Sequence, residues 1–336
     1  MSFIEKFTGR IDEFQQRRSW LALPFAVMKK FGDDRAGNLA ALIAYYAFFS
    51  MFPLLLVFTA LLGLVLRSNP ELQGKIIGSA LAQFPIIGDQ IRHNLPALSG
   101  KGAGVAVGFG TITALWAGLG VMQAAQNALN DVSDVPMKSR PNFLQTRLRA
   151  LIMLVVLGSF ALGSTVLSGL GTWEGSLGVV MRVVGFAGSL VLNFIAFSVA
   201  YRVLTDRDLS WGDVFPGAVF AAVAWGAIQA LGSFYLSHQL KQSTQVYGFF
   251  GFVLGLLAWI YLGAQIMLLG AEVNVVKGKR LWPRSLMPPP LIEADKRALE
   301  RHAKVEERRP EQTVEVTFQA EEKSGQAADG GTDRGQ

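Results

Sequence analysis

Between Arg35 and Arg67 the chain reads NLAALIAYYAFFSMFPLLLVFTALLGLVL (residues 38–66), a run of 29 residues without one charged side chain. At about 1.5 Å per helical residue, this run is longer than the ~30 Å hydrocarbon core of a bilayer requires. A soluble domain has no use for so long an apolar helix. The run therefore predicts that the chain enters a membrane.

The centre of this run differs from a simple membrane anchor because it carries Tyr45, Tyr46, Ser50 and Pro53. Pro53 has no backbone N–H and frees the carbonyl of Phe49, which Ser50 is close enough to help satisfy. The sequence therefore predicts a kinked or broken first span. A kinked span with polar side chains suits a protein that moves a substrate better than one that only sits in the membrane.

The composition points to several membrane spans. Hydrophobic residues make up 51% of the 336 and charged residues 17%, and the mean hydropathy is +0.34. These values exclude a disordered chain. There is no cysteine, which excludes disulfides, thiolate metal sites and cysteine nucleophiles. No cleavable signal precedes the first apolar run, so we expect that run to act as an uncleaved signal-anchor.

Apolar segments along the chain predict an all-α integral membrane protein with six transmembrane helices. A short interfacial helix is expected over residues 14–30, and an amphipathic extracytoplasmic segment over 67–102, between the first two spans. The predicted spans are 39–66, 103–125, 150–171, 183–204, 214–236 and 247–271.

The distribution of Lys and Arg predicts the orientation of these spans. The first 38 residues carry seven and the residues after 271 carry twelve, whereas 172–182 and 237–246 carry one each. Basic loops stay in the cytoplasm, so both termini are predicted to lie inside, in the bacterial inner membrane. This divides the chain into a cytoplasmic N-terminal segment, a six-helix membrane domain and a charged, partly disordered cytoplasmic tail (1–38, 39–276 and 277–336).

Small residues recur at i, i+4 spacing in the spans, and such pairs let membrane helices approach closely. Packing within one subunit accounts for them, and a homo-oligomer is the alternative. The pairs are Gly104 with Gly108, Gly217 with Ala221, Ala222 with Gly226 and Ala230, and Gly251 with Gly255.

Four segments of the sequence, taken in their order along the chain, resemble the YihY/BrkB family of bacterial inner-membrane proteins. Some members of this family are named ribonuclease BN or virulence factor. The resemblance covers roughly residues 25–280, although LTDRDLSW before the fifth span lacks the proline often found there. It implies six membrane helices, an inner-membrane location and a link to envelope integrity or lipid handling. The pieces are AYYAFFSMFPLLL, ITALWAGLGVMQAAQNALND, WGDVFPGAVFAAVAW and YGFFGFVLGLLAWIYLGAQIMLLGAEVN.

The residue types and spacings in the chain argue against a ribonuclease active site. A nuclease needs a metal site or an acid–base pair, and the chain has no H-x-E, no H-x-x-x-H and no paired carboxylates within a span. Asp131 and Asp134 lie close in sequence, but Lys138 and Arg140 follow, as in an ordinary cytoplasmic loop. We therefore expect no enzyme activity, no catalytic residue, no cofactor, no metal and no nucleic-acid partner.

Polar residues at membrane depth are better candidates for function, because an unsatisfied polar group in hydrocarbon costs several kcal/mol. They are predicted to line a pathway between helices. For each one alone, the alternative is a single interhelical hydrogen bond that serves packing. The predicted pathway residues are Tyr45, Tyr46, Ser50, Pro53, Asn127, Asn130, Asn193, Gln229 and Gln265.

Glu272 is the carboxylate closest to a membrane helix interior, at the end of the sixth span. Ionisable residues in a membrane span are functional hypotheses by default. Arg35 or Lys277 is a candidate partner, and the alternative is that Glu272 faces cytoplasmic water. If it is buried, Glu272 is a candidate proton-coupling site.

Three functions follow as hypotheses, with membrane lipids as the expected partners. The first is transport or translocation of a lipid or other envelope-related amphipathic substrate. The second is a non-transporting scaffold for envelope integrity, and the least favoured is a membrane-associated ribonuclease. The inverted repeats typical of secondary transporters are not evident in the sequence.

Overall fold

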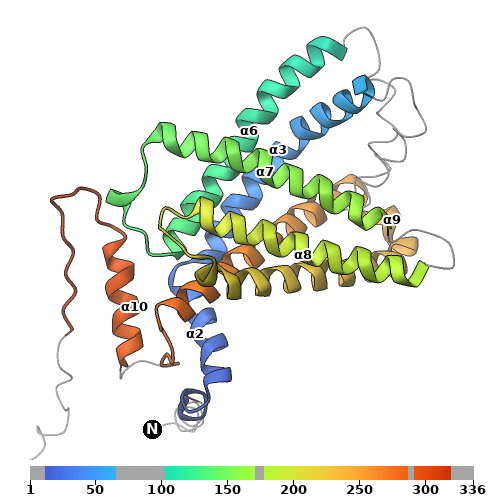
Figure 1. Ribbon diagram of the computed structural model, residues 1–336. Coiled ribbons are helices and arrows are strands. Elements are labelled where there is room, and N and C mark those ends of the chain that lie inside the picture. The colour runs from blue at the N-terminus through green and yellow to red at the C-terminus, as the bar shows by residue number, and fades with distance from the viewer. Residues whose placement is uncertain (1–11, 66–102, 171–177, 287–290, 319–336) are drawn as a thin grey trace, which may run out of the picture.

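The computed structural model describes residues 12–65, 103–170, 178–286 and 291–318, and in this part of the chain all regular secondary structure is helical. The predicted segment 67–102 lies outside the described residues. A short 3-10 turn, Met137–Ser139, joins two of the long helices. Figure 1 shows the helices, which are α2 (Ser19–Asp33), α3 (Ala36–Val65), α6 (Ala103–Val132), α7 (Phe143–Leu170), α8 (Gly178–Leu204), α9 (Trp211–Gly278) and α10 (Glu293–Lys304).

Helix α3 contains the long apolar run of the sequence and packs along α6. Its helical assignment continues through Pro53, so the predicted kinked or broken span is not broken there, and the kink stays a prediction. The Ser50 hydroxyl donates to the carbonyl of Ala47 (2.9 Å), and not to the carbonyl of Phe49 that Pro53 frees. The close contact of α3 with α6 includes Tyr46, whose ring lies 3.2 Å from the position that a Cβ on Gly120 would take.

Helix α9 is assigned as one element of 68 residues, but it folds back on itself. A straight helix would separate residues 217 and 274 by about 85 Å, at 1.5 Å per residue. The backbone N–H of Gly217 instead donates to Oδ1 of Asn274 at 2.6 Å. The rings of Trp225 and Trp259 also meet, with centroids 5.9 Å apart. The two limbs are therefore antiparallel, as the predicted fifth and sixth spans require, although the expected loop 237–246 is helical in its backbone.

Four stretches of the described helices are long and apolar enough to cross a membrane, and a shorter apolar stretch covers Ala36–Met51. Much of their surface consists of exposed large apolar side chains, such as Val183 and Phe186 on α8. Such surfaces are unusual in a soluble monomer and suit contact with lipid. The four stretches are Phe143–Phe160, Val183–Leu204, Trp211–Gly232 and Val253–Gly278.

The core between the helices is built largely from small side chains. Buried alanines lie on every long helix of the core, and they let helix backbones approach closely. The nearest approach joins the two limbs of α9, where a Cβ on Gly217 would lie 1.9 Å from the carbonyl oxygen of Gly270. Only glycine fits there.

The polar helix ends gather on one side of the bundle. Helices α2 and α10 lie near each other there, together with the chain that links α6 to α7 and α8 to α9 (Figure 1). Asp295 fixes α10 to this side: its carboxylate accepts hydrogen bonds from Lys29 Nζ (2.9 Å), Arg284 Nε (2.5 Å) and the backbone N–H of Ser285 (3.0 Å). Burial disfavours the charge of Asp295, but these donors outweigh it and lower the pKa of the carboxyl.

The predicted interfacial helix 14–30 corresponds to α2, which begins only at Ser19 and ends at Asp33, and its place at the interface stays a prediction. Although Pro24 lies within it, α2 continues from Ser19 to Asp33. Trp20 and Met28 are 66% and 60% exposed, while Ala22 and Ala26 are buried. The helix thus has an apolar outer surface and an inner face that packs on the end of α9.

Candidate functional site

Two helix ends turn their chains toward a common point. After α6, the backbone N–H of Val135 bonds to the carbonyl of Asn130 (2.9 Å), and Asp134 between them has a left-handed backbone (φ 53°). After α9, the N–H of Leu281 bonds to the carbonyl of Val276 (3.0 Å) in the same way. Both are Schellman-type helix ends, in which aspartate tolerates the left-handed position better than most residues. The two turns place Asp134 and Lys279 beside α2.

Lys30 of α2 is the centre of a buried charge cluster at this point, and its side chain is 3% exposed. The ammonium donates to the carboxylates of Asp34 and Asp134 (Nζ–Oδ1 3.2 Å) and to the carbonyl of Val132 (2.9 Å). Burial opposes a charge on Lys30. The carboxylates of Glu272, Asp134 and Asp34 outweigh burial and raise the pKa of the lysine above its ordinary value.

Glu272 lies next to this ammonium without a hydrogen bond from it. The residue is fully buried, and its Oε2 is 3.6 Å from Nζ of Lys30. An ammonium has three N–H donors, and Lys30 already uses three on other acceptors. Within the described part of the chain, no N–H or O–H group donates to either carboxyl oxygen of Glu272, and the carboxylate of Asp34 is close enough to share a hydrogen bond when one of the two carries a proton. Neither Arg35 nor Lys277, the partners expected from the sequence, pairs with Glu272, and the buried side chain does not face water. The nearby cation is Lys30.

The cluster continues on both sides of Lys30. Lys279 Nζ donates to Oδ2 of Asp134 (2.9 Å) and to the carbonyl of Ser133 (2.6 Å). Burial lowers the pKa of Lys279 to about 8, although Asp134 partly offsets this effect. On the other side, Nδ1 of His302 lies 3.3 Å from Oδ1 of Asp34. This hydrogen bond raises the pKa of the histidine.

The pKa of Asp34 is affected by burial and by two of the same groups, Lys30 and His302. Burial disfavours its charge, but the hydrogen bond with His302 and the charge of Lys30 outweigh burial and lower the pKa of Asp34. The cluster therefore joins α2, the end of α6, the end of α9 and the tail helix α10. Its members are Lys30, Asp34, Asp134, Glu272, Lys279 and His302.

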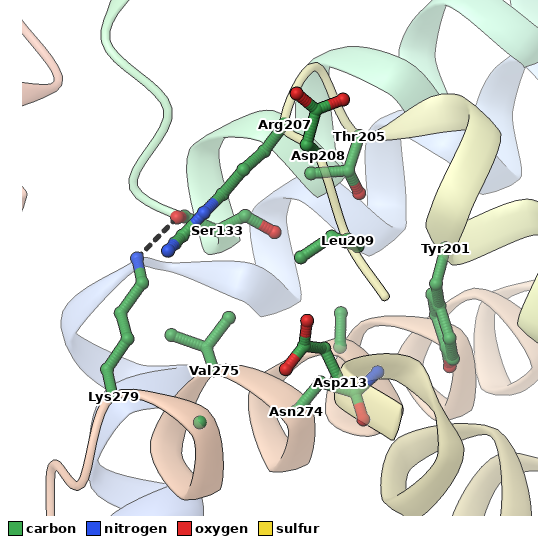
Figure 2. A pocket seen from close by; sticks show the side chains of 12 residues that line it. Ser133, Tyr201, Thr205, Arg207, Asp208, Leu209, Asp213, Asn274, Val275 and Lys279 are labelled. Atoms are coloured by element: carbon green, nitrogen blue, oxygen red, sulfur yellow. Dashed lines mark hydrogen bonds between the residues drawn. The ribbon is translucent and has the colours of Figure 1, made fainter. Parts of the chain in front are cut away.

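A cavity of about 100 Å³ opens beside Lys279. Figure 2 shows the side chains that line it, with the hydrogen bond from Lys279 to Ser133 drawn as a dashed line. The α8–α9 corner supplies Arg207 and Asp208, and the end of α9 supplies Asn274. The buried cluster thus borders a small polar space on the side where the helix ends gather.

The predicted pathway residues lie in several different settings. Tyr45 and Tyr46 are 55% and 42% exposed and meet edge to face, with ring centroids 5.7 Å apart. Asn130 is buried and holds Asp206 of the α8–α9 corner through two hydrogen bonds of 2.6 and 2.7 Å. Ser50 is buried, Asn127 is exposed, and Pro53, Asn193, Gln229 and Gln265 are half-buried. The contacts of Tyr45, Ser50 and Asn130 are local or lie at a helix end, so a continuous polar seam stays a prediction.

Sequence reasoning identified Glu272 but missed most of its neighbours. In the sequence, Lys30 falls at the end of the predicted interfacial helix 14–30, and Asp134 falls in a stretch typical of an ordinary cytoplasmic loop. Position was a partial signal. Lys30, Asp134 and Lys279 lie in the last turn of a helix or just after it, whereas Glu272 lies inside α9 and His302 on the charged helix α10. Asn274 was quoted within the last resembling piece, but its contact with Gly217 needed the folded hairpin.

Comparison with known proteins gives the family. The sequence model of a family described as virulence factor BrkB matches residues 27–288. The ribonuclease-like protein YfkH of Bacillus subtilis is 29% identical over 252 residues, which cover 72% of this chain and 90% of that protein. A UPF0761 membrane protein of Vibrio campbellii is 26% identical over 268 residues, covering 76% and 81%.

Other relatives are longer than the region they share with this chain. A UPF0761 membrane protein of Janthinobacterium is 28% identical over 185 residues, which cover 52% of this chain and 41% of that protein. No solved structure matches the chain. The names of the UPF0761 relatives agree with the apolar helices in describing membrane proteins, whereas the name of YfkH calls that protein ribonuclease-like. Since the family match extends over well more than half of the sequence, the chain belongs to the virulence factor BrkB family, also called YihY/BrkB, of membrane proteins.

Proposed function

We propose that this protein moves a lipid or another amphipathic envelope substrate across the bacterial inner membrane, and that Glu272 takes up and releases a proton during the cycle. The observation that carries the proposal is the state of Glu272, which is fully buried and accepts no hydrogen bond from a described N–H or O–H group, while the carboxylate of Asp34 lies close enough to share a proton with it. Buried carboxylates of this kind in membrane helices mark ion and proton pathways.

The charges around Glu272 support a role for a proton. Lys30 and Lys279 supply two positive charges and His302 a third when it is protonated, whereas Asp34, Asp134 and Glu272 supply three negative charges when all are ionised. While His302 is neutral, a proton on Glu272 makes the two sums equal. A buried carboxylate that accepts no hydrogen bond is costly in its charged form, so proton binding at this residue is coupled to any movement that changes its surroundings.

The membrane arrangement is part of the proposal. The described helix ends gather on one side of the bundle (Figure 1). Six spans with both termini in the cytoplasm would produce this arrangement. The basic residues of α2, the α6–α7 connection and the tail then lie inside, in agreement with the positive-inside rule. The cavity beside Lys279 would open to the cytoplasm.

A non-transporting scaffold is the second candidate. Among the described residues, no atom lies within 4 Å of the position of a Cβ added to Gly108, which belongs to the predicted small-residue pair on α6. An open small-residue surface of this kind is suited to a second helix from another copy of the chain. That the protein has no enzyme activity stays a prediction. Membrane-associated ribonuclease stays the least favoured of the three functions.

Liposome reconstitution tests the proposal directly. Purified protein would be placed in liposomes with fluorescent phospholipids, and movement between leaflets measured with and without a pH gradient. We expect the wild type to move lipid at a rate that responds to the gradient. Glu272→Gln removes the titrating group at nearly constant shape, so we expect at least a tenfold lower rate at equal protein level and thermal stability.

Glu293→Gln is the matched control, because Glu293 is an exposed carboxylate of α10 whose side chain is 80% accessible. This variant should move lipid as the wild type does. Full transport by Glu272→Gln would disprove the role of Glu272. Failure of the wild type to move any lipid tested would favour the scaffold.

A further inference from the structure

A second hollow, of about 510 Å³, lies between the first turns of α7 and the α8–α9 corner. Three arginines line it, Arg149 from α7, Arg202 from the last turn of α8 and Arg207 from the corner. Asp206 and Asp208 are the acidic residues in its wall. The hollow therefore has an excess of one positive charge, and its shape is open toward the outside of the bundle.

The charge of Asp206 is already satisfied within the protein. Its carboxylate accepts hydrogen bonds from the guanidinium of Arg149 and from Nδ2 of Asn130 (2.6 Å), and its backbone N–H donates to Oδ1 of Asn130 (2.7 Å). Asp206 therefore holds the α8–α9 corner against α6 and α7. It does not neutralise the two remaining arginines.

Arg202 and Arg207 keep their donors available. Arg202 stacks on the ring of Trp211, with Cζ 4.7 Å from the ring centroid. This contact orients the guanidinium and leaves its N–H groups at the edge unoccupied. Within the described residues, neither guanidinium donates a hydrogen bond to a protein acceptor. One guanidinium oriented by Trp211, with the free donors of a second one in the same wall, suits an anion with several oxygens, such as a phosphate group.

The surroundings of the hollow favour a lipid over a soluble anion. Trp211 and Phe215, in the first turns of α9, are 56% and 55% exposed. Leu144 and Leu148, in the first turns of α7, are 76% and 58% exposed. Both pairs lie at the start of stretches apolar enough to cross a membrane. A headgroup in the hollow would leave its acyl chains beside these side chains, whereas a soluble anion would use the arginines alone.

We propose that this hollow binds the phosphate group of an anionic membrane lipid, with Arg202 and Arg207 as the residues that hold it. Arg207 and Asp208 line both this hollow and the cavity beside Lys279, but the hollow shares no residue with the Glu272 cluster, and the proposal does not depend on transport. Arginines that only set the orientation of a span would meet lipid headgroups without preference among them. A specific binding site instead prefers headgroups of a given charge, and lipid binding to it reaches saturation.

Titration with lipid tests the proposal. Purified full-length protein in an uncharged detergent would be titrated with short-chain phosphatidylglycerol, with short-chain phosphatidylcholine and with inorganic phosphate. Trp211 beside Arg202 serves as the fluorescent reporter, and its signal is identified by difference from Trp211→Phe. We expect a saturable change with phosphatidylglycerol and an affinity at least tenfold weaker for the other two compounds.

The double variant Arg202→Gln/Arg207→Gln should weaken phosphatidylglycerol binding at least tenfold while its unfolding temperature stays within the range of the control. Arg297→Gln/Arg308→Gln is the matched control, because it removes the same two charges from exposed positions of the C-terminal segment. It should bind as the wild type does. Equal affinity for phosphatidylcholine, unchanged binding by the first variant, or inorganic phosphate binding as tightly as lipid would each overturn the proposal.

Discussion

At the residue scale, Lys30 holds the site together because its three N–H donors are shared among groups from separate helices. Asp134 is the member that links it to Lys279, through Oδ1 at 3.2 Å and Oδ2 at 2.9 Å. Removing one partner from a buried ion cluster leaves uncompensated charge and costs about 3–5 kcal/mol. We therefore expect Asp134→Asn, which keeps the tolerance for a left-handed backbone, to lower the free energy of unfolding by about 3 kcal/mol.

Thermal unfolding in detergent checks this prediction, and two further variants sharpen it. Lys279→Met removes the excess positive charge and should restore part of the stability when combined with Asp134→Asn. Asp131→Asn breaks a more exposed pair with Arg140, where the side chains are 35% and 17% exposed. Its cost should stay within about 1 kcal/mol. An unchanged unfolding temperature for Asp134→Asn would contradict the assignment of Asp134 to the cluster.

At the element scale, the packing of the two limbs of α9 depends on glycine. A Cβ on Gly217 would lie 1.9 Å from the carbonyl oxygen of Gly270 and 2.6 Å from the side chain of Asn274. The backbone oxygen cannot move aside without separating the limbs. We expect Gly217→Ala to destabilise the protein by about 1–3 kcal/mol. Thermal unfolding and the fluorescence of the packed Trp225–Trp259 pair both measure the effect.

The control for this prediction is another helical glycine with space around it. An added Cβ on Gly158 of α7 has no atom within 4 Å. Alanine is the better helix former by about 0.5–1 kcal/mol, so Gly158→Ala should leave stability unchanged or raise it slightly. If both substitutions had the same effect, helix propensity and not limb packing would govern position 217.

At the scale of the whole molecule, hydropathy predicted most of the helical framework, because the length and apolar character of a span follow from the bilayer. The sequence also identified Glu272 as the carboxylate nearest a helix interior. It did not predict the contact with Lys30, since the rotation of each helix is set by packing against the others and leaves no local pattern. For the same reason, Asn130 was placed among pathway residues, whereas the fold commits it to Asp206 at a helix end.

The shared location of the helix ends leads to a prediction of topology. The chain has no cysteine, so single cysteines can be introduced and labelled without background. Cysteines at Arg17, Ser139 and Lys304 occupy exposed positions before α2, between α6 and α7, and at the end of α10. If both termini lie in the cytoplasm, a membrane-impermeant maleimide should label all three only after spheroplasts are permeabilised. A cysteine at Ser68, in the predicted extracytoplasmic segment, should react in intact spheroplasts. Labelling of Ser139→Cys and Lys304→Cys from opposite sides would contradict the arrangement itself, whereas labelling of all three inside positions in intact spheroplasts would reverse the orientation and keep the fold.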